Sequence, residues 1–452
     1  MPLFDHSSVR GGREVFGSPG VDTSCIRGRG DPMTWGRGGV RPGALSPRFM
    51  VYFTLALALF AQDSYDDVAQ NLVGALEGMD ETIPNRALFT RARQRLGPEV
   101  LETVFRRVCG PVAPARVGTA FWRGMRLAAV DGFVLDLPDN KANRELFGGW
   151  SDARGAPAGF PQVRVVTLTE TGTHASIDAR IGGFNGGERE LAVQMASSAA
   201  GMLVIMDRNF PGVELWKAYT HAGAHLLLRA RSTVASRPLE VLPDGSYLGR
   251  VSLGRQRASH PGGVTVRVVE YRTDGGELIR LLTDLLDAEA YPAAELASLY
   301  HDRWEAESAY RQVKTFQRGP AQVLRSATPA LAHQEVWAHL VVHHCLNGII
   351  MRVADGERID PHRISFVKAH KHVRRSVIQQ TKDAVSAVGA FLAMLEVKIR
   401  RKLDTGPRRS RSAPRVLKRP DAKYSPSVKK QQPGPTRRVP AKVITLSPAT
   451  LQ

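Results

Sequence analysis

The chain has 452 residues, 43% of them apolar, and can therefore bury two or three hydrophobic cores. Its formal net charge of +19 favours a polyanionic partner, nucleic acid ahead of a membrane surface. The charge is uneven, because positions 398–442 hold 16 Lys and Arg residues and two Asp residues. That stretch therefore carries +14, and the rest of the chain carries only +5. The three cysteines lie far apart without ligand spacing, which argues against a disulfide framework and a zinc site and favours a reducing compartment.

The N-terminal part of the chain divides into two segments. Residues 1–47 hold ten glycines and scattered arginines without a hydrophobic period, which predicts a disordered, atypical extension. Residues 48–112 are predicted to form a helical domain, in which Ser64 is a candidate N-cap. The apolar run from Phe49 to Ala61 is too short to span a bilayer and indicates a buried helix, so we expect a cytoplasmic protein without a membrane partner.

Within this domain, one helix is predicted to begin at Pro84 and another after the break at Gly97-Pro98. The first of the two carries four arginines, Arg86, Arg91, Arg93 and Arg95. Two helices around a tight turn could dock on DNA. An ordinary helical bundle decorated with arginines fits the pattern equally well, so the sequence leaves both interpretations open.

From residue 120 short strand-like runs give way to alternating helices and strands, which predicts an α/β fold with a mixed sheet and helices on its faces. Residues 120–234 would form the first part of this domain. Residues 235–285 would form a β-rich insertion, with a helix predicted at its end, at ELIRLLTDLLD (277–287). Residues 286–390 would return to the main domain through a long helix around Glu307 and further buried helices. Residues 391–452 are rich in Pro, Ser, Lys and Arg and predict a basic, mostly disordered tail.

Two isolated aspartates each follow a short apolar run. Asp131 comes after RLAAV and Asp207 after LVIM, so both are predicted at the ends of buried strands, where sites form in open α/β sheets. Each aspartate also has a purely structural interpretation. Asp131-Gly132 is a common hairpin turn, and Asp207 could cap the helix that follows Pro211.

The segment around residue 307 carries the pattern Y-x2-R-x3-E-x6-K, formed by Tyr300, Arg303, Glu307 and Lys314. On a single helix these four positions fall within roughly 60° of one another. An apolar strip is predicted on the opposite side, formed by Ala306, Ala309, Val313 and Phe316. A solvated charged face would give the same spacing, and the two upstream aspartates are what favour a functional site.

Asp131, Asp207 and Glu307 would bring three carboxylates together from three separate elements. Carboxylates without Cys or His ligands suit a hard cation, Mg²⁺ or Mn²⁺. Two such ions can activate a water or hydroxyl and stabilise the leaving oxygen in phosphodiester chemistry.

These residues resemble the motifs of bacterial insertion-sequence DDE transposases, in the family-four group with the Y-x2-R-x3-E-x6-K signature. The resemblance includes the Asp131-Gly132 context, the Asp207-Arg208-Asn209-Phe210 context and Trp304 directly after the signature arginine, and it extends over about residues 48–375. It implies an RNase H-like catalytic domain carrying Asp131, Asp207 and Glu307, with the β-rich insertion between the last two. It also implies metal-dependent cleavage at transposon ends and strand transfer into target DNA.

The resemblance gives the remaining signature residues their expected roles. Arg303 and Lys314 would contact phosphates beside the scissile bond, with Arg208 as a weaker candidate. Tyr300 would hydrogen-bond a phosphate or simply pack in the core. Trp304 would stack on a displaced base or likewise pack. The expected partners are inverted-repeat end DNA and target DNA, and residues 48–112 are the candidate segment for recognising the ends. A homodimer is expected in the synaptic complex, on the nucleoid.

Other expectations concern histidines and alternative functions. His343 and His344 lie in an apolar pattern and are predicted to be a packed pair rather than a metal site. His362, His370 and His372 stand among lysines and arginines, which predicts a basic surface. Two other functions fit the same residues: an RNase H-like structure-selective nuclease that does not transfer strands, and a catalytically idle DNA-binding protein descended from a transposase.

Overall fold

The computed structural model describes residues 45–73, 84–231, 236–251, 264–272, 278–319, 323–379, 388–400 and 442–443. The expected extension over residues 1–47 therefore lies almost entirely outside the described residues. The N-terminal part is helical, as predicted, with α1 (Pro47–Leu59), α2 (Tyr65–Val73), α3 (Arg86–Leu96) and α4 (Glu99–Val108). A 3₁₀ turn at Gly118–Ala120 leads into the sheet.

Local capping sets the ends of these helices. Ser64 and Asp67 form a reciprocal capping box at the start of α2, in which the Ser64 hydroxyl accepts from the Asp67 N–H at 3.1 Å and the Asp67 carboxylate accepts from the Ser64 N–H at 3.1 Å. Gly97 ends α3 with φ of 79°, a backbone region that favours glycine. Both ends agree with the sequence prediction.

One arginine of α3 is a core residue rather than a surface charge. Arg93 is fully buried, and its guanidinium donates to Gln334 Oε1 at 3.2 Å and to the Leu331 carbonyl at 3.1 Å. These contacts join α3 to the first turns of α10. The other three arginines of this helix, Arg86, Arg91 and Arg95, are exposed.

The central sheet is mixed. Its first seven strands are β1 (Phe121–Trp122), β2 (Met125–Asp136), β3 (Gly149–Ser151), β4 (Pro157–Glu170), β5 (Ser176–Gly183), β6 (Met202–Met206) and β7 (His225–Arg229). The connecting helices are α5 (Lys141–Phe147), α6 (Glu188–Val193) and α7 (Val213–His221), with a 3₁₀ turn at Ala196–Ala199. Along the sheet the order is β5-β4-β2-β6-β7, with β4 antiparallel to both β5 and β2, and with β2, β6 and β7 parallel. This order and these directions are those of an RNase H-like sheet.

The segment expected to be an insertion is β-rich, but it continues the same sheet. Its strands are β8 (Ser236–Val241), β9 (Tyr247–Val251), β10 (Val264–Arg272) and β11 (Leu278–Thr283). β11 pairs antiparallel with β7, so the sheet extends in the order β7-β11-β10-β9-β8. The predicted helix at 277–287 is wrong, because residues 278–283 pair with both β7 and β10 and this pairing overrides the local pattern.

The C-terminal part is helical. It contains α8 (Ala293–Tyr300), α9 (Trp304–Arg311), α10 (Pro329–Gly356), α11 (Phe366–Gln379) and α12 (Val388–Arg400), with 3₁₀ turns at His301–Arg303 and Pro361–Arg363 and a π-helical turn at Gln312–Gln317. α12 runs past residue 390, where the basic tail was expected to begin, and β12 (Lys442–Val443) pairs with β10. The rest of the tail lies outside the described residues.

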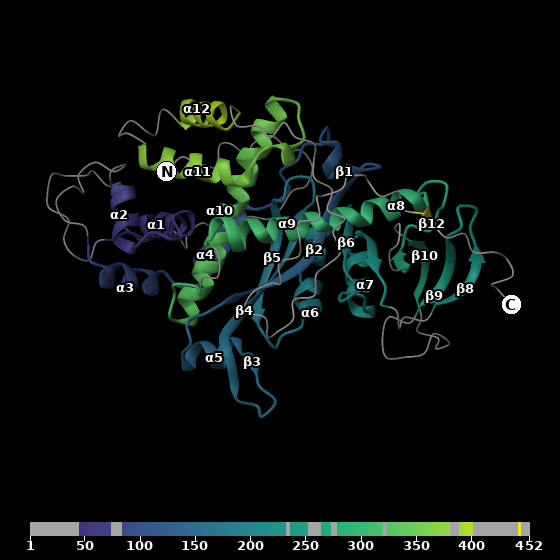
Figure 1. The fold of residues 1–452 in the computed structure, drawn as a ribbon, viewed down its shortest axis with the longest axis horizontal. Coiled ribbons are helices and arrows are strands. Elements are labelled where there is room, and N and C mark those ends of the chain that lie inside the picture. Colours follow the sequence, from purple (N-terminus) through teal and green to yellow (C-terminus); the bar gives the residue numbers. More distant parts are fainter. Residues whose placement is uncertain are drawn as a thin grey trace, which may run out of the picture.

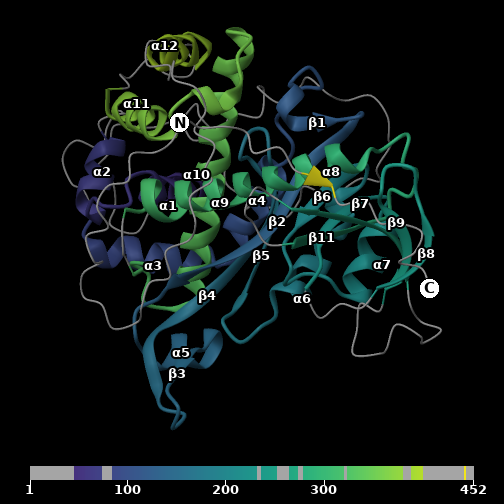
Figure 2. The same cartoon turned by 45° about the vertical axis from the view of Figure 1, so that its right-hand side comes forward.

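Two hydrophobic cores lie on opposite faces of the sheet. Side chains of β2 alternate between them: Ala129 and Phe133 belong to the larger core with α1, α9 and α10, whereas Ala128 and Val130 belong to the smaller core with α6 and α7. Helices α1–α4 and α10–α12 gather at one end of the molecule, β8–β10 lie at the other with α8 beside them, and α9 passes over β2 (Figures 1 and 2). The β3–β4 hairpin projects from the body (Figures 1 and 2).

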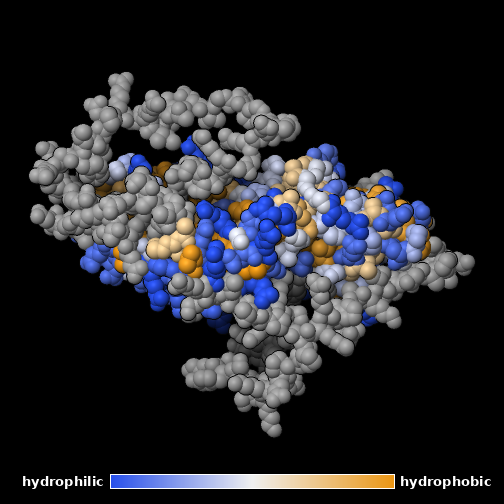
Figure 3. All heavy atoms as spheres, turned by 90° about the horizontal axis from the view of Figure 1, so that it is seen from above, coloured by the Kyte–Doolittle hydropathy of each residue, from blue (hydrophilic) through white to orange (hydrophobic). Residues whose placement is uncertain are grey.

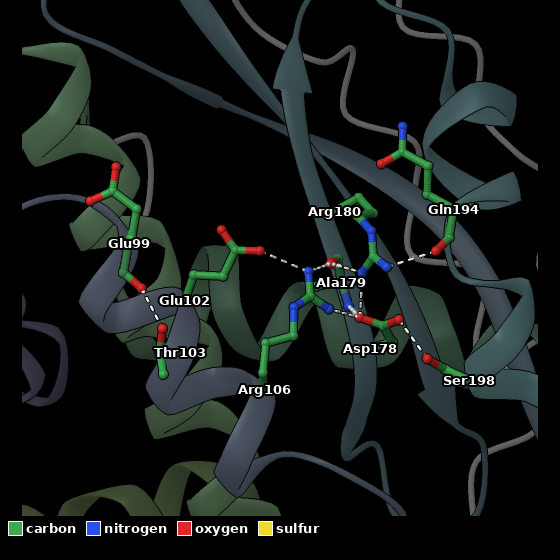
Figure 4. Close-up of polar contacts among 9 residues, drawn as sticks. All are labelled: Glu99, Glu102, Thr103, Arg106, Asp178, Ala179, Arg180, Gln194 and Ser198. Atoms are coloured by element: carbon green, nitrogen blue, oxygen red, sulfur yellow. Dashed lines mark hydrogen bonds and ion pairs between the residues drawn. The ribbon is translucent and has the colours of Figure 1, made fainter. Parts of the chain in front are cut away.

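A buried carboxylate joins the helical end to the sheet (Figure 4). Asp178 on β5 accepts from Arg106 on α4, from Arg180 at 2.6 Å and from the Ser198 hydroxyl at 2.7 Å. Arg106 also donates to the Ala179 carbonyl at 3.0 Å. These contacts join the N-terminal helix α4 to the central sheet.

The described surface is mainly hydrophilic. Seen from above, it is mostly blue with scattered apolar residues (Figure 3). Among the residues that the structure describes, no helix is both long enough and apolar enough to cross a membrane.

Candidate active site

The two aspartates lie side by side because of strand register. β2 and β6 are parallel with Val130 opposite Met206, so the next residues, Asp131 and Asp207, stand about one strand spacing apart. Both continue the alternation that faces the larger core, under α9. The prediction that these two residues come together is supported by the paired strands.

The structural interpretations of both aspartates are wrong. β2 continues through Asp131 and Gly132 to Asp136, paired with β4, so there is no hairpin turn at this point and Asp131 is not at a strand end. Asp207 does follow the end of β6, but its carboxylate accepts from the Asn209 N–H at 2.7 Å. The helix after Pro211 has Gly212 at its N-cap without a side-chain hydrogen bond, so Asp207 does not cap it.

The signature segment is not one straight helix. α8 ends at Tyr300, a 3₁₀ turn carries Arg303, α9 carries Glu307, and a π-helical turn carries Lys314. The apolar strip is buried as predicted at Ala306, Ala309 and Val313. Phe316 is instead 39% exposed, because the wider π turn shifts the phase of the helix before that position is reached.

Arg303 lies between the carboxylates. Its Nη2 donates to Glu307 Oε1 at 3.2 Å, and its Nη1 is 3.8 Å from Asp131 Oδ2. Burial lowers the pKa of Arg303, but the nearby Tyr300, Glu307, Asp131 and Asp207 outweigh that effect and raise it, so the guanidinium stays charged. One buried cation thus neutralises part of a three-carboxylate cluster.

Asp131 has an unusual protonation equilibrium. Burial is the main cause that raises its pKa from 3.8 to about 7, and the charges of Asp207 and Glu188 act in the same direction. The Gly132 N–H, which donates to Asp131 at 2.8 Å, and the Arg303 charge act in the opposite direction. A carboxyl whose charge is disfavoured by burial and by neighbouring carboxylates would be stabilised in its charged form by a bound cation.

Sequence reasoning missed Glu188. This residue begins α6, its carboxylate accepts from Arg164 at 2.5 Å, and its charge acts on Asp131. A Cβ at Gly132 would lie 3.0 Å from the Glu188 carboxyl, so the glycine permits this close approach. Glu188 also lines, with Asn209, a hollow of about 320 Å³. The only signal in the sequence was the glycine after Asp131.

Tyr310 was missed as well. It is buried on α9, its hydroxyl lies 3.3 Å from the Thr167 hydroxyl, and its ring packs on Phe133 at a centroid distance of 4.9 Å. Thr167 is the residue paired with Asp131 across β4. Tyr310 therefore helps to seat α9 on the strand that carries the first aspartate.

The other predicted site residues fall into different positions. Tyr300 is buried and hydrogen-bonds Arg303, which agrees with a packing residue at the site rather than an exposed phosphate contact. Lys314 is exposed, and the charged groups that act on it are Arg318 and Asp136. Arg208 is exposed on the turn after Asp207. The side chain of Trp304 lies outside the described residues.

The donor set fits the expected metal. Asp131, Asp207 and Glu307 offer oxygen ligands alone, from β2, from the residue after β6 and from a helix that passes over β2, which suits a hard divalent cation. The pKa of about 7 for Asp131 is raised mainly by burial and less by neighbouring carboxylates, and a bound cation would stabilise the charge that both disfavour. These three residues could hold such ions.

The histidine predictions divide. His343 and His344 are buried, with His343 Nε2 2.9 Å from Gln312 Oε1 and His344 Nδ1 3.0 Å from the Ser176 carbonyl. Burial lowers the pKa of His343 to about 3 and that of His344 to about 4. They are therefore a neutral packed pair, as predicted. The predicted basic surface is present at the exposed Arg363, Lys368, Lys371 and Arg375, but His362 and His370 do not lie on it. His370 is buried against the Leu59 carbonyl, and the His362 side chain is 8% exposed.

Comparisons with known proteins agree with this geometry. Residues 34–106 match the family described as insertion element 4 transposase N-terminal, and residues 122–343 match the transposase DDE domain. The first match begins inside the stretch expected to be an atypical extension. The chain is 28% identical over 401 residues to the transposase InsG for insertion sequence element IS4 of Escherichia coli K12, covering 87% of this chain and 90% of that one.

Among solved structures, the piggyBac transposase in its synaptic complex with hairpin DNA aligns over 77% of this chain and 76% of that one, with a TM-score of 0.40 and 10% identity. Both domain matches cover the segments that carry the helical N-terminal part, the two aspartates and the signature glutamate. The chain belongs to the IS4 family of DDE transposases.

Proposed function

We propose that this chain is a catalytically competent transposase that cleaves DNA at transposon ends and transfers the resulting 3′-hydroxyl into target DNA. The observation that carries the proposal is the convergence of Asp131, Asp207 and Glu307 around Arg303. Three carboxylates that share one largely buried guanidinium leave negative charge uncompensated, which is unfavourable unless the cluster has a functional purpose.

Each residue has a role in this proposal. Asp131, Asp207 and Glu307 would hold two Mg²⁺ or Mn²⁺ ions, which would supply an activated water or 3′-hydroxyl and stabilise the leaving oxygen. Arg303 would turn from the carboxylates to a phosphate beside the scissile bond. Tyr300 would position Arg303 through their hydrogen bond.

The remaining contacts to DNA are proposed from exposure and charge. Lys314 and Arg208 are exposed and would contact phosphates of the flanking duplex. Trp304 stays a candidate for stacking on a displaced base. The exposed arginines of α3, a helix that Arg93 holds against α10, would contact the inverted repeats. A homodimer in the cytoplasm would pair two ends and the target.

The test is cleavage of a labelled duplex that carries the element's own end, with and without Mg²⁺. Wild type is expected to nick at the repeat boundary only with the metal, and Asp131→Asn and Glu307→Gln are each expected to abolish nicking while end binding is retained. Glu145→Gln is a matched control, because Glu145 is an exposed carboxylate on α5 paired only loosely with Lys141, at 3.8 Å.

The outcomes separate the alternatives. Joining of the nicked 3′ end to a second duplex supports the transposase, and nicking without joining supports the structure-selective nuclease. Tight end binding without nicking under Mg²⁺ or Mn²⁺ would contradict the proposal and leave a DNA-binding protein. Nicking that survives Glu307→Gln would refute the assignment of the site.

A further inference from the structure

A second cluster of ligand atoms lies on the other side of α9. His174, Glu305 and His362 place one ligand atom each within 4.8 Å of one another, and no other group of three His, Cys, Asp or Glu residues does so among the residues that the structure describes. The three come from separate elements: the turn between β4 and β5, helix α9, and the 3₁₀ turn after α10. All three side chains are largely buried, with 10%, 18% and 8% of their surface exposed.

The spacing of these atoms suits a tetrahedral ion. Glu305 Oε2 is 2.8 Å from His174 Nε2 and 3.6 Å from His362 Nε2. Bonds of about 2.0–2.1 Å in tetrahedral geometry separate neighbouring ligand atoms by roughly 3.3–3.4 Å, which lies between the two observed distances. Two imidazoles and one carboxylate form a ligand set that Zn²⁺ and related transition metals take up, in contrast to the all-carboxylate cluster at Asp131.

Both imidazoles have a further polar neighbour. His362 Nδ1 lies 3.1 Å from the Asp360 carboxylate without forming a hydrogen bond with it, on the side where metal-bound histidines commonly make their outer contact. His362 Nε2 lies 3.2 Å from the Thr171 carbonyl, a contact that an ion would replace. His174 Nδ1 lies 2.9 Å from the Gln312 amide, which also contacts His343 Nε2 at 2.9 Å. Rotating this amide by half a turn would place its oxygen toward His174 Nδ1 and its nitrogen toward His343 Nε2. Both contacts would be kept while the tautomers of both rings reverse. His174 Nε2 could then bind an ion.

We propose that His174, Glu305 and His362 form a transition-metal site, with Zn²⁺ as the preferred ion and a water as the fourth ligand. Binding replaces the proton that His174 Nε2 shares with Glu305 by the metal, and the ring takes up a proton at Nδ1 as its tautomer reverses, so no net proton is released. The ion would join α9 to the β4–β5 turn and to the segment after α10. Since Glu305 is two residues before Glu307, the ion would hold the helix that carries the proposed catalytic glutamate.

This positioning role rests on the proposed function, whereas the metal site itself does not, so binding is tested without DNA. The untagged full-length protein is stripped with a chelator and then titrated with Zn²⁺ in excess Mg²⁺, which occupies the carboxylate cluster. Bound zinc is measured by equilibrium dialysis, and Co²⁺ absorption reports the coordination geometry. One tightly bound Zn²⁺ per chain is expected, with the visible absorption of a tetrahedral Co²⁺ site.

Variants identify the ligands. His174→Asn, which keeps a residue tolerant of the left-handed backbone at φ 63°, and Glu305→Gln should each lower Zn²⁺ affinity at least about 100-fold, and Asp360→Asn about 10-fold. His225→Asn is the matched control, since His225 pairs with Asp284 at 2.8 Å outside any such group. Circular dichroism and melting temperature check the fold.

Two results would overturn the site. If wild type binds no zinc tightly in excess Mg²⁺, His174, Glu305 and His362 form a structural ion-paired cluster rather than a metal site. Tight binding that His174→Asn, Asp360→Asn and Glu305→Gln all leave unchanged would place the ion elsewhere. Where a ligand variant fails to fold, the melting temperature of wild type decides: Zn²⁺ should raise it in excess Mg²⁺, and an unchanged value contradicts the site. Loss of zinc binding together with intact DNA cleavage would remove the positioning role alone.

Discussion

Removing the charge at Asp131 should make the metal-free protein more stable at neutral pH. The pKa of this carboxyl is raised from 3.8 to about 7 in the folded state, mainly by burial. Between these two values the folded protein holds a proton that the unfolded chain has released, so stability falls as the pH rises through this window and is constant above it. Asp131→Asn stays neutral throughout and should escape this loss.

The size of the effect follows from the shift. A displacement of about 3 pKa units corresponds to about 4 kcal/mol at 1.36 kcal/mol per unit. This is an upper value, because 18% of the Asp131 side chain is exposed and Arg303 remains 3.8 Å away. The free-energy difference between Asp131→Asn and wild type should therefore grow by at most about 4 kcal/mol from pH 4 to pH 7.

Urea unfolding of both proteins without divalent cations, across this pH range, measures the difference directly. Groups that both proteins share cancel in the subtraction. At pH 8, Mg²⁺ at about 100 times its dissociation constant should restore about 2.7 kcal/mol to wild type and much less to Asp131→Asn. A free-energy difference that does not change with pH would refute the raised pKa, and equal stabilisation of both proteins by Mg²⁺ would refute Asp131 as a ligand.

Three further predictions concern other contacts. Arg303→Gln should lower the cleavage rate about 10²–10³-fold in a single-turnover assay, as loss of a charge-stabilising donor does. Gly132→Ala should cost about 1–3 kcal/mol in urea unfolding because its Cβ meets the Glu188 carboxyl, and the cost should shrink when Glu188→Ala is added. Arg93→Ala should cost at least about 3 kcal/mol by leaving buried acceptors unpaired, whereas Arg91→Ala at the exposed face should stay within about 0.5 kcal/mol; equal effects would contradict the buried role of Arg93.

The sequence predicted those features that depend on periodicity and on ordered spacing. One of the buried helices expected after the signature segment is α10 (Pro329–Gly356), which the sequence indicates because its residues form a regular apolar pattern. The short strands after residue 120 were expected for the same reason. The candidate site was found because Asp131 and Asp207 follow apolar runs and Glu307 stands in a four-residue signature, and parallel register then brings the two aspartates together.

Features that depend on pairing between distant strands were not predictable. Asp131-Gly132 has the local chemistry of a turn, yet nine residue pairs from Ala128 to Asp136 hold β2 against β4 and keep it extended. Phe316 left its predicted face because a π turn begins at Gln312, which no local pattern indicated. Glu188 carries no motif of its own, and only the fold brings α6 close to Asp131.

The five strands between Asp207 and Glu307, β7 to β11, explain how the glutamate reaches the aspartates. β7 runs parallel to β6 and therefore ends at the edge of the sheet where Asp207 stands. β11 runs antiparallel to β7, with Thr283 opposite Leu227, and so ends near the opposite edge. From there α8 runs back along the sheet to Tyr300. The charge of Arg229, at the end of β7, acts on the pKa of the Tyr300 phenol, so the two side chains are near each other. α9 then passes over β2 with Glu307 beside Arg303. The added strands thus reverse the direction of the chain, so that Glu307 lies beside Asp131 and Asp207.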